Sequence, residues 1–475
     1  MAVLAVLVIF TLFTVLAAAN PRAALLVSVF FMPWNGLDID IGLRITVYQL
    51  SLAGLVLVTL VRLTQPGLRP VAIAAWPLFA AFLLYAVIWS LLQLGIFPQL
   101  RITTEGLRGP NVRAVIQILL FLFSVSPVVL YPMLIRDSDD VLRIGRVYLA
   151  GVVVMSLIGW LQLVGWYATG NNPLPIGAFG NALGGGYAEA RSGSYVLDAL
   201  NIYRMNSFAG EPRDLGIAIV VALIAIQSVA LVARRPATGK LLLLWVFLFL
   251  TLLSTVSTSG IGLWVIASPT LVPACWLFGV KIARSGRQLL GVLALLVLPL
   301  VVIVGALQAS GIPVIDIIAN RTIERVNSDG ALEDFDKTII SWLETAPQAA
   351  IAGVGLGNAH LYATPFLDPL FALYAEGNVF VAKTQYLRFI SEIGIIGLSL
   401  FLGWYLWLTI AAARVVRGHP QLAVLIPAVS GILVIAMGTF QAIAMSWALA
   451  GCMAALCALL PRRAAATPLP DAVAA

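Results

Sequence analysis

The stretch Lys383-Thr-Gln-Tyr-Leu-Arg-Phe-Ile-Ser-Glu-Ile-Gly-Ile-Ile-Gly397 joins a polar part of the chain to an apolar part. Thirteen charged residues, out of 28 basic and 21 acidic residues in the whole chain, lie between Gln308 and Tyr386. The apolar run 388–413 follows, and as a helix it is long enough to cross about 30 Å of hydrocarbon. The stretch therefore predicts a membrane boundary with a large polar loop before it.

Apolar runs of similar length recur through all 475 residues. The composition is 61% hydrophobic and 10% charged, and the mean hydropathy is +1.01, which excludes a soluble globular protein. Because backbone groups in lipid must bond within their own segment, we expect an all-α polytopic membrane protein. We expect its spans at 2–19, 23–34, 45–62, 72–97, 114–135, 146–168, 215–233, 241–257, 259–282, 289–308, 388–413, 421–439 and 441–460.

The spans divide the chain into membrane and loop regions. The first two spans could form a shallow hairpin, so the expected number is 12 to 13, and the first is interpreted as a retained helix rather than a cleaved signal peptide. The expected regions are N-terminal transmembrane helices (1–168), an outer loop (169–214), central transmembrane helices (215–308), a large outer catalytic loop (309–386), C-terminal transmembrane helices (387–461) and a cytoplasmic tail (462–475).

Basic residues alternate between the connections and predict the orientation. The loops assigned to the cytoplasmic side carry sixteen basic and four acidic residues, against twelve basic and seventeen acidic residues on the other side. The split of +12 against −5 accounts for the net charge of +7, so the basic character reflects topology and does not support nucleic-acid binding. The two large loops then face away from the cytoplasm.

Metal and cofactor chemistry has no sequence signal. Cys275, Cys452 and Cys457 lie in apolar spans, and no ligand spacing of the kind zinc needs occurs. The glycine run 353–357 lacks the strand–turn–helix context of a nucleotide loop. We therefore expect no metal and no cofactor.

Arginines near the end of the first outer loop are candidate anion ligands. Arg204 and Arg213 flank the turn at Pro212, and the guanidinium fork suits diphosphate oxygens. The alternative is that both only extend to the membrane interface or pair with acids such as Glu211 and Asp214.

Two residues of the large loop are candidate bases. His360 follows the glycine run, where a neutral imidazole could accept a proton, although an isolated loop histidine commonly has no such role. Lys383 should share a helical face with Tyr386, and it could bind phosphate, act as a base if desolvated, or anchor the helix at the interface.

The same segment contains a predicted ion pair and an amphipathic helix. Arg388 and Glu392 are spaced i, i+4, and Glu392 lies inside an apolar span, so we expect it to be buried and paired. Apolar residues at helical spacing over 334–346 predict an amphipathic helix at the membrane surface or over a cavity. Its Lys337 and Trp342 could reach a lipid headgroup, and a plain surface helix would explain them equally well.

Together these motifs resemble the bacterial O-antigen ligase and O-antigen polymerase superfamily, which has a GT-C-like helical fold. The resemblance covers the order of spans, the large late loop, and the outer arginine before a Glu-Pro helix start at Arg204, Glu211 and Pro212. It is closest over 334–398, on Lys337, Trp342, Pro347, Gly353, Gly355, Gly357, Asn358, Tyr386, Leu387, Glu392, Gly394 and Gly397.

The resemblance implies a metal-independent, inverting glycan transfer from an undecaprenyl-diphosphate carrier to an acceptor hydroxyl. It also implies a bacterial inner membrane and contact with other polysaccharide assembly proteins. Arginines would hold the diphosphate, and a histidine would activate the acceptor. That histidine position is Lys383 here, which leaves His360, Lys383 or no residue as the base and favours a polymerase over a ligase. The alternatives are a chain without transferase activity, and a flippase or secondary transporter of lipid-linked glycan, which usually needs ionisable groups at mid-membrane.

Overall fold

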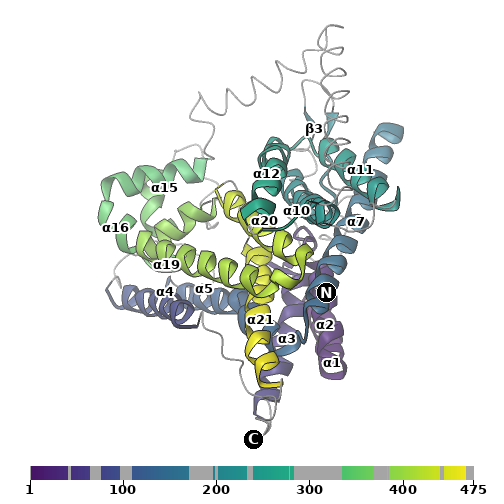
Figure 1. Cartoon of the computed structure of the whole chain (residues 1–475). Coiled ribbons are helices and arrows are strands. Elements are labelled where there is room, and N and C mark those ends of the chain that lie inside the picture. The colour runs from purple at the N-terminus through teal and green to yellow at the C-terminus, as the bar shows by residue number, and fades with distance from the viewer. Residues whose placement is uncertain are drawn as a thin grey trace, which may run out of the picture.

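The chain folds into a helical bundle in which several helices have the length and composition to cross a membrane. The computed structural model describes residues 2–40, 44–64, 76–96, 110–170, 196–197, 202–232, 239–277, 279–282, 334–367, 382, 384–438 and 443–466. Within these residues, seven helices are long and apolar enough to be membrane spans, and five further apolar helices are shorter. The protein is therefore an all-α polytopic membrane protein (Figure 1).

The N-terminal helices are fixed by local caps. The elements are α1 (Ala2–Ala19), α2 (Pro21–Phe31), the antiparallel pair β1 (Asp38–Asp40) and β2 (Arg44–Thr46), and α3 (Val47–Leu63). Asn20 accepts a hydrogen bond from the Ala23 N–H, and Thr46 forms a reciprocal capping box with Gln49. α1 packs along α3, and α2 packs against both α3 and α7.

The next region contains three membrane-length apolar segments. It consists of α4 (Trp76–Ile96), α5 (Pro110–Val125), α6 (Pro127–Leu134) and α7 (Ser138–Thr169). The span expected at 114–135 is confirmed as the apolar segment Val115–Leu134. Ser126 separates α5 from α6 within it and keeps helical φ and ψ, because Pro127 only lacks the N–H that would continue the hydrogen-bond ladder. α6 then packs along α21.

The central region surrounds the most deeply buried helix. It consists of the antiparallel pair β3 (Val196–Leu197) and β4 (Ile202–Tyr203), the 3₁₀ turn η2 (Ser207–Ala209), α10 (Pro212–Val232), α11 (Gly239–Ser254) and α12 (Thr258–Leu277). α10 is enclosed by α7, α11, α12 and α20. Most of its side chains are buried, which explains why it is apolar on every face.

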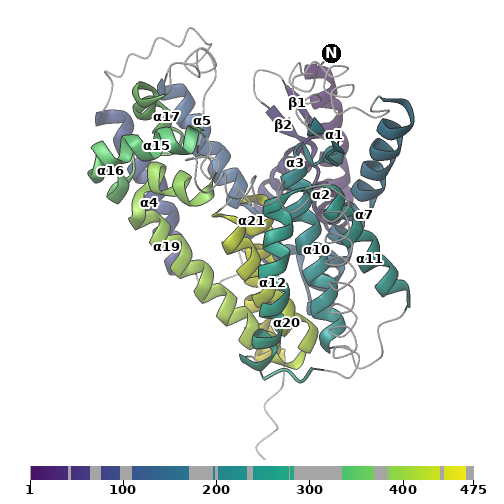
Figure 2. The same cartoon turned by 90° about the horizontal axis from the view of Figure 1, so that it is seen from above.

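The C-terminal region pairs a small helical cap with three long helices. The cap consists of α15 (Asp334–Thr345), α16 (Pro347–Ala352), α17 (Ala359–Ala363) and the 3₁₀ turn η3 (Thr364–Phe366). The long helices are α19 (Gln385–Val415), α20 (Pro420–Ala436) and α21 (Ile443–Ala466), with the turn η4 (Val416–Gly418) after α19. Figure 2 shows α19 running from the cap towards α20 and α21.

An aromatic cluster joins α4, α19 and α21. Phe82 contacts Phe401 and Trp447, with ring centroids 5.6 and 6.2 Å apart, and Trp404 contacts Phe79 at 4.7 Å. All five side chains are buried. The cluster fixes α19, the helix that carries most of the candidate residues, against the rest of the bundle.

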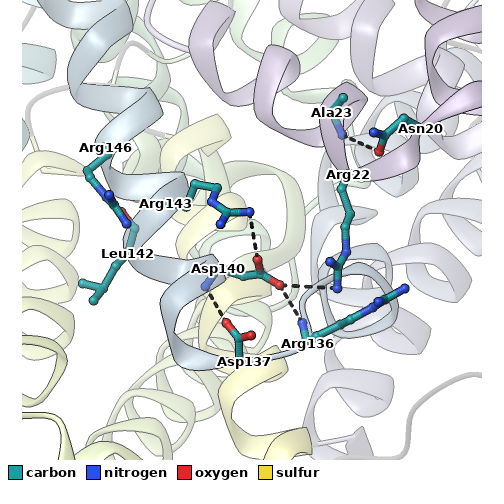
Figure 3. A network of polar contacts seen from close by, with 9 residues as sticks. All are labelled: Asn20, Arg22, Ala23, Arg136, Asp137, Asp140, Leu142, Arg143 and Arg146. Atoms are coloured by element: carbon teal, nitrogen blue, oxygen red, sulfur yellow. Dashed lines mark hydrogen bonds and ion pairs between the residues drawn. The ribbon is translucent and has the colours of Figure 1, made fainter.

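One end of the bundle contains the basic loops that the charge pattern assigns to one side. Asp140 lies 3.6 Å from both Arg22 and Arg143, so it joins the start of α2 to the start of α7 (Figure 3). The His419 ring nitrogen lies 3.2 Å from the Ser138 hydroxyl oxygen, which places the α19–α20 connection at the same end. The structure therefore confirms that these three connections share one end of the bundle.

Most expected spans match helices to within a few residues. One expected span, 388–413, is interrupted by a break inside α19, described below. The span expected at 289–308 and the tail after Ala466 lie outside the described residues, as does most of the outer loop 169–214. The amphipathic helix predicted over 334–346 is confirmed as α15.

Candidate functional site

The signature around Glu392 lies on a broken helix. α19 leaves helical geometry at Gly394, whose φ of 68° and ψ of 177° separate an outer segment from the long apolar remainder. Near the break, the carbonyl oxygens of Ser391 and Glu392 accept hydrogen bonds from the Val354 and Gly355 N–H groups, at 3.2 and 2.8 Å. The glycine run is therefore joined directly to the broken helix.

Close backbone approach explains two of the glycines in the signature. A Cβ on Gly353 would collide with the Glu392 carbonyl, and a Cβ on Gly394 would collide with the Ile351 carbonyl. Both glycines also have positive φ, a conformation that other residues adopt only with strain. The sequence pattern is thus satisfied by a tight crossing of two chain segments.

The opposite side of the glycine run packs on α4. The Trp89 indole N–H donates to the Gly353 carbonyl at 3.1 Å, and the Tyr85 hydroxyl donates to the Ala352 carbonyl at 2.9 Å. The Leu356 N–H donates to the Ser90 hydroxyl at 2.9 Å. Because the N–H groups of 354–356 are occupied by protein acceptors, this run does not form a phosphate-binding nest.

The predicted ion pair is confirmed and lies one turn before the break. Arg388 Nε lies 3.2 Å from Glu392 Oε1, and only 3% of the Glu392 side chain is exposed, against 22% for Arg388. A buried carboxylate needs such a partner, because taking its charge out of water is costly. The pair is therefore a fixed charge arrangement just outside the long apolar part of α19.

Lys383 and Tyr386 were expected to share one helical face at the start of α19, and the structure describes only the second of them. Lys383 lies outside the described residues, and α19 begins at Gln385, after its N-cap Thr384. Tyr386 does share the helix with Arg388, but its hydroxyl donates to the Val434 carbonyl of α20 at 2.6 Å. Tyr386 thus holds α19 against α20, which gives its hydroxyl a structural partner.

Lys337 and His360 lie in the cap, whose helices α15 and α17 contact the helix that carries Arg388 and Glu392. Trp342 of α15 stacks on Tyr362 of α17, with ring centroids 5.6 Å apart, and α15 and α17 both contact α19. Burial raises the pKa of Tyr362 to about 12, so its hydroxyl stays protonated at neutral pH. His360 is buried and Lys337 half-buried. The apolar face of α15 therefore covers α16 and α17, in agreement with a helix lying over another part of the protein.

The arginines of the first outer loop lie at the start of α10. Arg213 Nη2 is 3.3 Å from Glu211 Oε2, so the pairing weighed as an alternative is present. Arg204 follows β4 and is half-buried, and the turn after it is held by the Ser207 hydroxyl, which donates to the Met155 carbonyl at 2.6 Å. Both arginines are thus positioned by a structured turn.

The two sets of candidates are carried by different segments of the chain. η2 packs on α7 and α10, whereas α15 and α17 pack on each other and on α19. α20 contacts both α10 and α19, so it lies beside the helix that follows Arg204 and beside the helix that carries Arg388. Among the described residues, no group of three or more His, Cys, Asp or Glu side chains could hold a metal ion.

One residue that the sequence reasoning missed belongs to this site. Gln385 is buried at the first position of α19, and its spacing of three and seven residues from Arg388 and Glu392 places all three on one face. The spacing was visible in the sequence, but the burial was not. Asp336, next to Lys337 in α15, is also buried and was not singled out.

Two comparisons by sequence bear on the resemblance of this chain to known families. No family model matches its sequence, and no curated protein matches it either. The resemblance described above therefore rests on the motif residues and their order along the chain.

Proposed function

We propose that this protein is a membrane glycosyltransferase of surface polysaccharide assembly. It transfers glycan units from an undecaprenyl-diphosphate carrier to an acceptor hydroxyl, and polymerisation is favoured over ligation. The main structural support is the buried Arg388–Glu392 pair, held beside the glycine crossing in a chain of many membrane-length helices. Fixed charges of this kind act on a charged leaving group without needing to reorganise during the reaction.

The proposed chemistry is a single displacement at the anomeric carbon. A lone pair of the acceptor oxygen forms the new glycosidic bond while the bond from that carbon to the diphosphate oxygen breaks, and the carrier diphosphate leaves with the electron pair. Arg204, Arg213, Lys337 and Arg388 supply positive charge for this leaving group. Glu211 and Glu392 orient the guanidinium groups of Arg213 and Arg388.

The acceptor proton moves to a base as the new bond forms. His360 is the base that the described residues favour, because it is buried in α17, and α17 packs on α19. A neutral imidazole is the form that accepts a proton. Lys383 remains the second candidate, on its sequence position alone.

The proposed location is the inner membrane of a bacterium, with the cap helices facing the periplasm or exterior. The net charges of +12 and −5 on the two sets of loops support this orientation. The proposed partners of the protein are then the bilayer and the carrier-linked glycan, together with other polysaccharide assembly proteins.

Reporter fusions test the orientation. Fusions made after Arg235 and after Asp334 are expected to report opposite sides of the membrane, the first cytoplasmic and the second external. Each fusion is made with two reporter enzymes, one that is active only outside the cytoplasm and one that is active only inside it. Signals from the same side for both fusions would contradict the proposed topology.

The lipid-linked glycan profile of a strain lacking the protein tests the function. Single repeat units accumulating on the carrier identify a polymerase, and long carrier-linked polymer identifies a ligase.

Arg204→Ala is expected to lower polymer formation by about 100-fold or more, as loss of one charge-stabilising donor does elsewhere, while the protein stays in the membrane. Arg146→Ala, an exposed arginine at the other end of the bundle, is the matched control. Normal polymer from Arg204→Ala would contradict the proposed role of Arg204 as a diphosphate ligand, and an unchanged profile in the deletion strain would contradict the function.

Transport is the second candidate, because one central helix carries features common in transporters. α12 contains Pro269 and Pro273, and its Ser268 hydroxyl donates to the buried Gln227 of α10 at 3.0 Å. Proline-interrupted helices with buried polar groups often line substrate paths. Repeat units held on the cytoplasmic side in the deletion strain would favour this function.

A further inference from the structure

Gln385 is a buried amide without a hydrogen-bond partner. Its side chain is 1% exposed, and neither its Oε1 nor its Nε2 has a partner among the described residues. Its backbone N–H donates to the Met437 carbonyl at 2.9 Å, so the end of α20 fixes the position of the residue. The orphaned amide therefore belongs to a well-anchored part of the structure.

Such an amide is costly to keep. A carboxamide that loses water on folding and gains no partner destabilises the folded chain, and folded proteins pair nearly all of their buried polar groups. Gln49 provides the contrast within this protein, because its Oε1 accepts the Thr46 N–H at 2.8 Å in a capping box. An unpaired group in an anchored position indicates a partner that the chain itself does not supply.

The surroundings of Gln385 indicate what kind of partner would fit. Arg388 follows one turn later on the same face, and Glu392 one turn after that, so Gln385 is the outermost member of a polar stripe. Tyr386, its neighbour, does not belong to this stripe, because its hydroxyl is occupied by Val434. The stripe ends at the break, before the apolar remainder of α19 begins.

We propose that the Gln385 carboxamide holds a hydroxyl group of the carbohydrate ligand, an assignment that rests on the proposed function. A carboxamide donates through nitrogen and accepts through oxygen, and sugar hydroxyls both accept and donate, so neighbouring hydroxyls of one sugar satisfy both atoms. A phosphate oxygen only accepts and would leave Oε1 unpaired. Gln385 is thus a positioning residue that sets the sugar against the charge pair, while the arginines hold the diphosphate.

The test compares Gln385→Met, a variant of nearly equal shape, with the unsubstituted protein in detergent and in cells. Removing an unpaired buried amide is expected to leave the Tm of the purified protein unchanged or to raise it. The same variant is expected to form polymer about tenfold more slowly at limiting substrate, the loss of one hydrogen bond. The substrate is the carrier-linked glycan that accumulates in the deletion strain, and we expect a higher KM with a smaller change in kcat.

Gln49→Met is the matched control, because that amide is paired within the protein. It should lower the Tm and leave the KM unchanged. A lower Tm for Gln385→Met, or an unchanged KM, would overturn the assignment of Gln385 while leaving the proposed function intact. If the deletion strain accumulates no carrier-linked glycan, the proposed function fails, and the assignment fails with it.

Discussion

Gly394→Ala is expected to prevent α19 from packing on the glycine run and to reduce the yield of folded protein strongly. An alanine Cβ at this position would collide with the Ile351 carbonyl and with the backbone of Ala352. Strained backbone geometry costs about 1–3 kcal/mol, and overpacking adds about 1–3 kcal/mol. Together these are a large fraction of a typical unfolding free energy of about 5–15 kcal/mol. The measurement is the yield and Tm of monodisperse protein after extraction in mild detergent.

Gly403→Ala, later in the same helix, is the control. A Cβ there meets no atom within 4 Å, and the backbone is helical. This variant should match the unsubstituted protein or exceed its stability by about 0.5–1 kcal/mol, the usual helical preference for alanine over glycine. Equal stability of the two variants would show that the crossing at Gly394 does not hold the fold.

Arg388→Met is expected to destabilise the protein strongly, because it leaves Glu392 as a buried carboxylate without its cation. Removing one partner of a buried ion pair costs about 3–5 kcal/mol. Polymer formation should also fall, since the guanidinium is proposed to face the leaving group. The unfolding temperature in detergent and the glycan profile of the complemented deletion strain measure the two effects separately.

The double variant Arg388→Met with Glu392→Leu separates stability from function. Replacing both charges by apolar groups of similar volume is often neutral or stabilising, so the Tm should recover. Polymer formation should remain absent, because no positive charge has returned. Recovery of both properties would mean that the pair is structural only, which would remove Arg388 and Glu392 from the proposed mechanism.

The helices were predictable because their signal is local. Apolar runs of about 20 residues identify spans without reference to the rest of the chain, and the i, i+4 spacing of Arg388 and Glu392 indicated their pairing. The break in α19 was not predictable in the same way. The chain at Gly394 leaves helical geometry at a close crossing with 351–355, a segment about 40 residues earlier in the sequence.

The roles of individual polar residues depended on contacts that no pattern contains. Tyr386 had the position of a ligand residue, and its hydroxyl is occupied by the Val434 carbonyl. Gln385 had a visible spacing from Arg388 and Glu392, but its importance comes from burial without a partner, which no spacing indicates. Asn358 ends the motif and closes its turn, since its side-chain amide donates to the Val354 carbonyl at 3.0 Å.

The break in α19 also determines how the protein fits its bilayer. The helical part from Ile395 to Val415 is about 31 Å long at 1.5 Å per residue, close to the hydrocarbon thickness of a typical membrane. The segment before Gly394 is anchored to α20 and to the glycine run by backbone hydrogen bonds. Because the aromatic cluster fixes the long part to α4 and α21, a tilt that matches a thicker or thinner bilayer moves these helices together, while the charge pair keeps its position beside the glycine run.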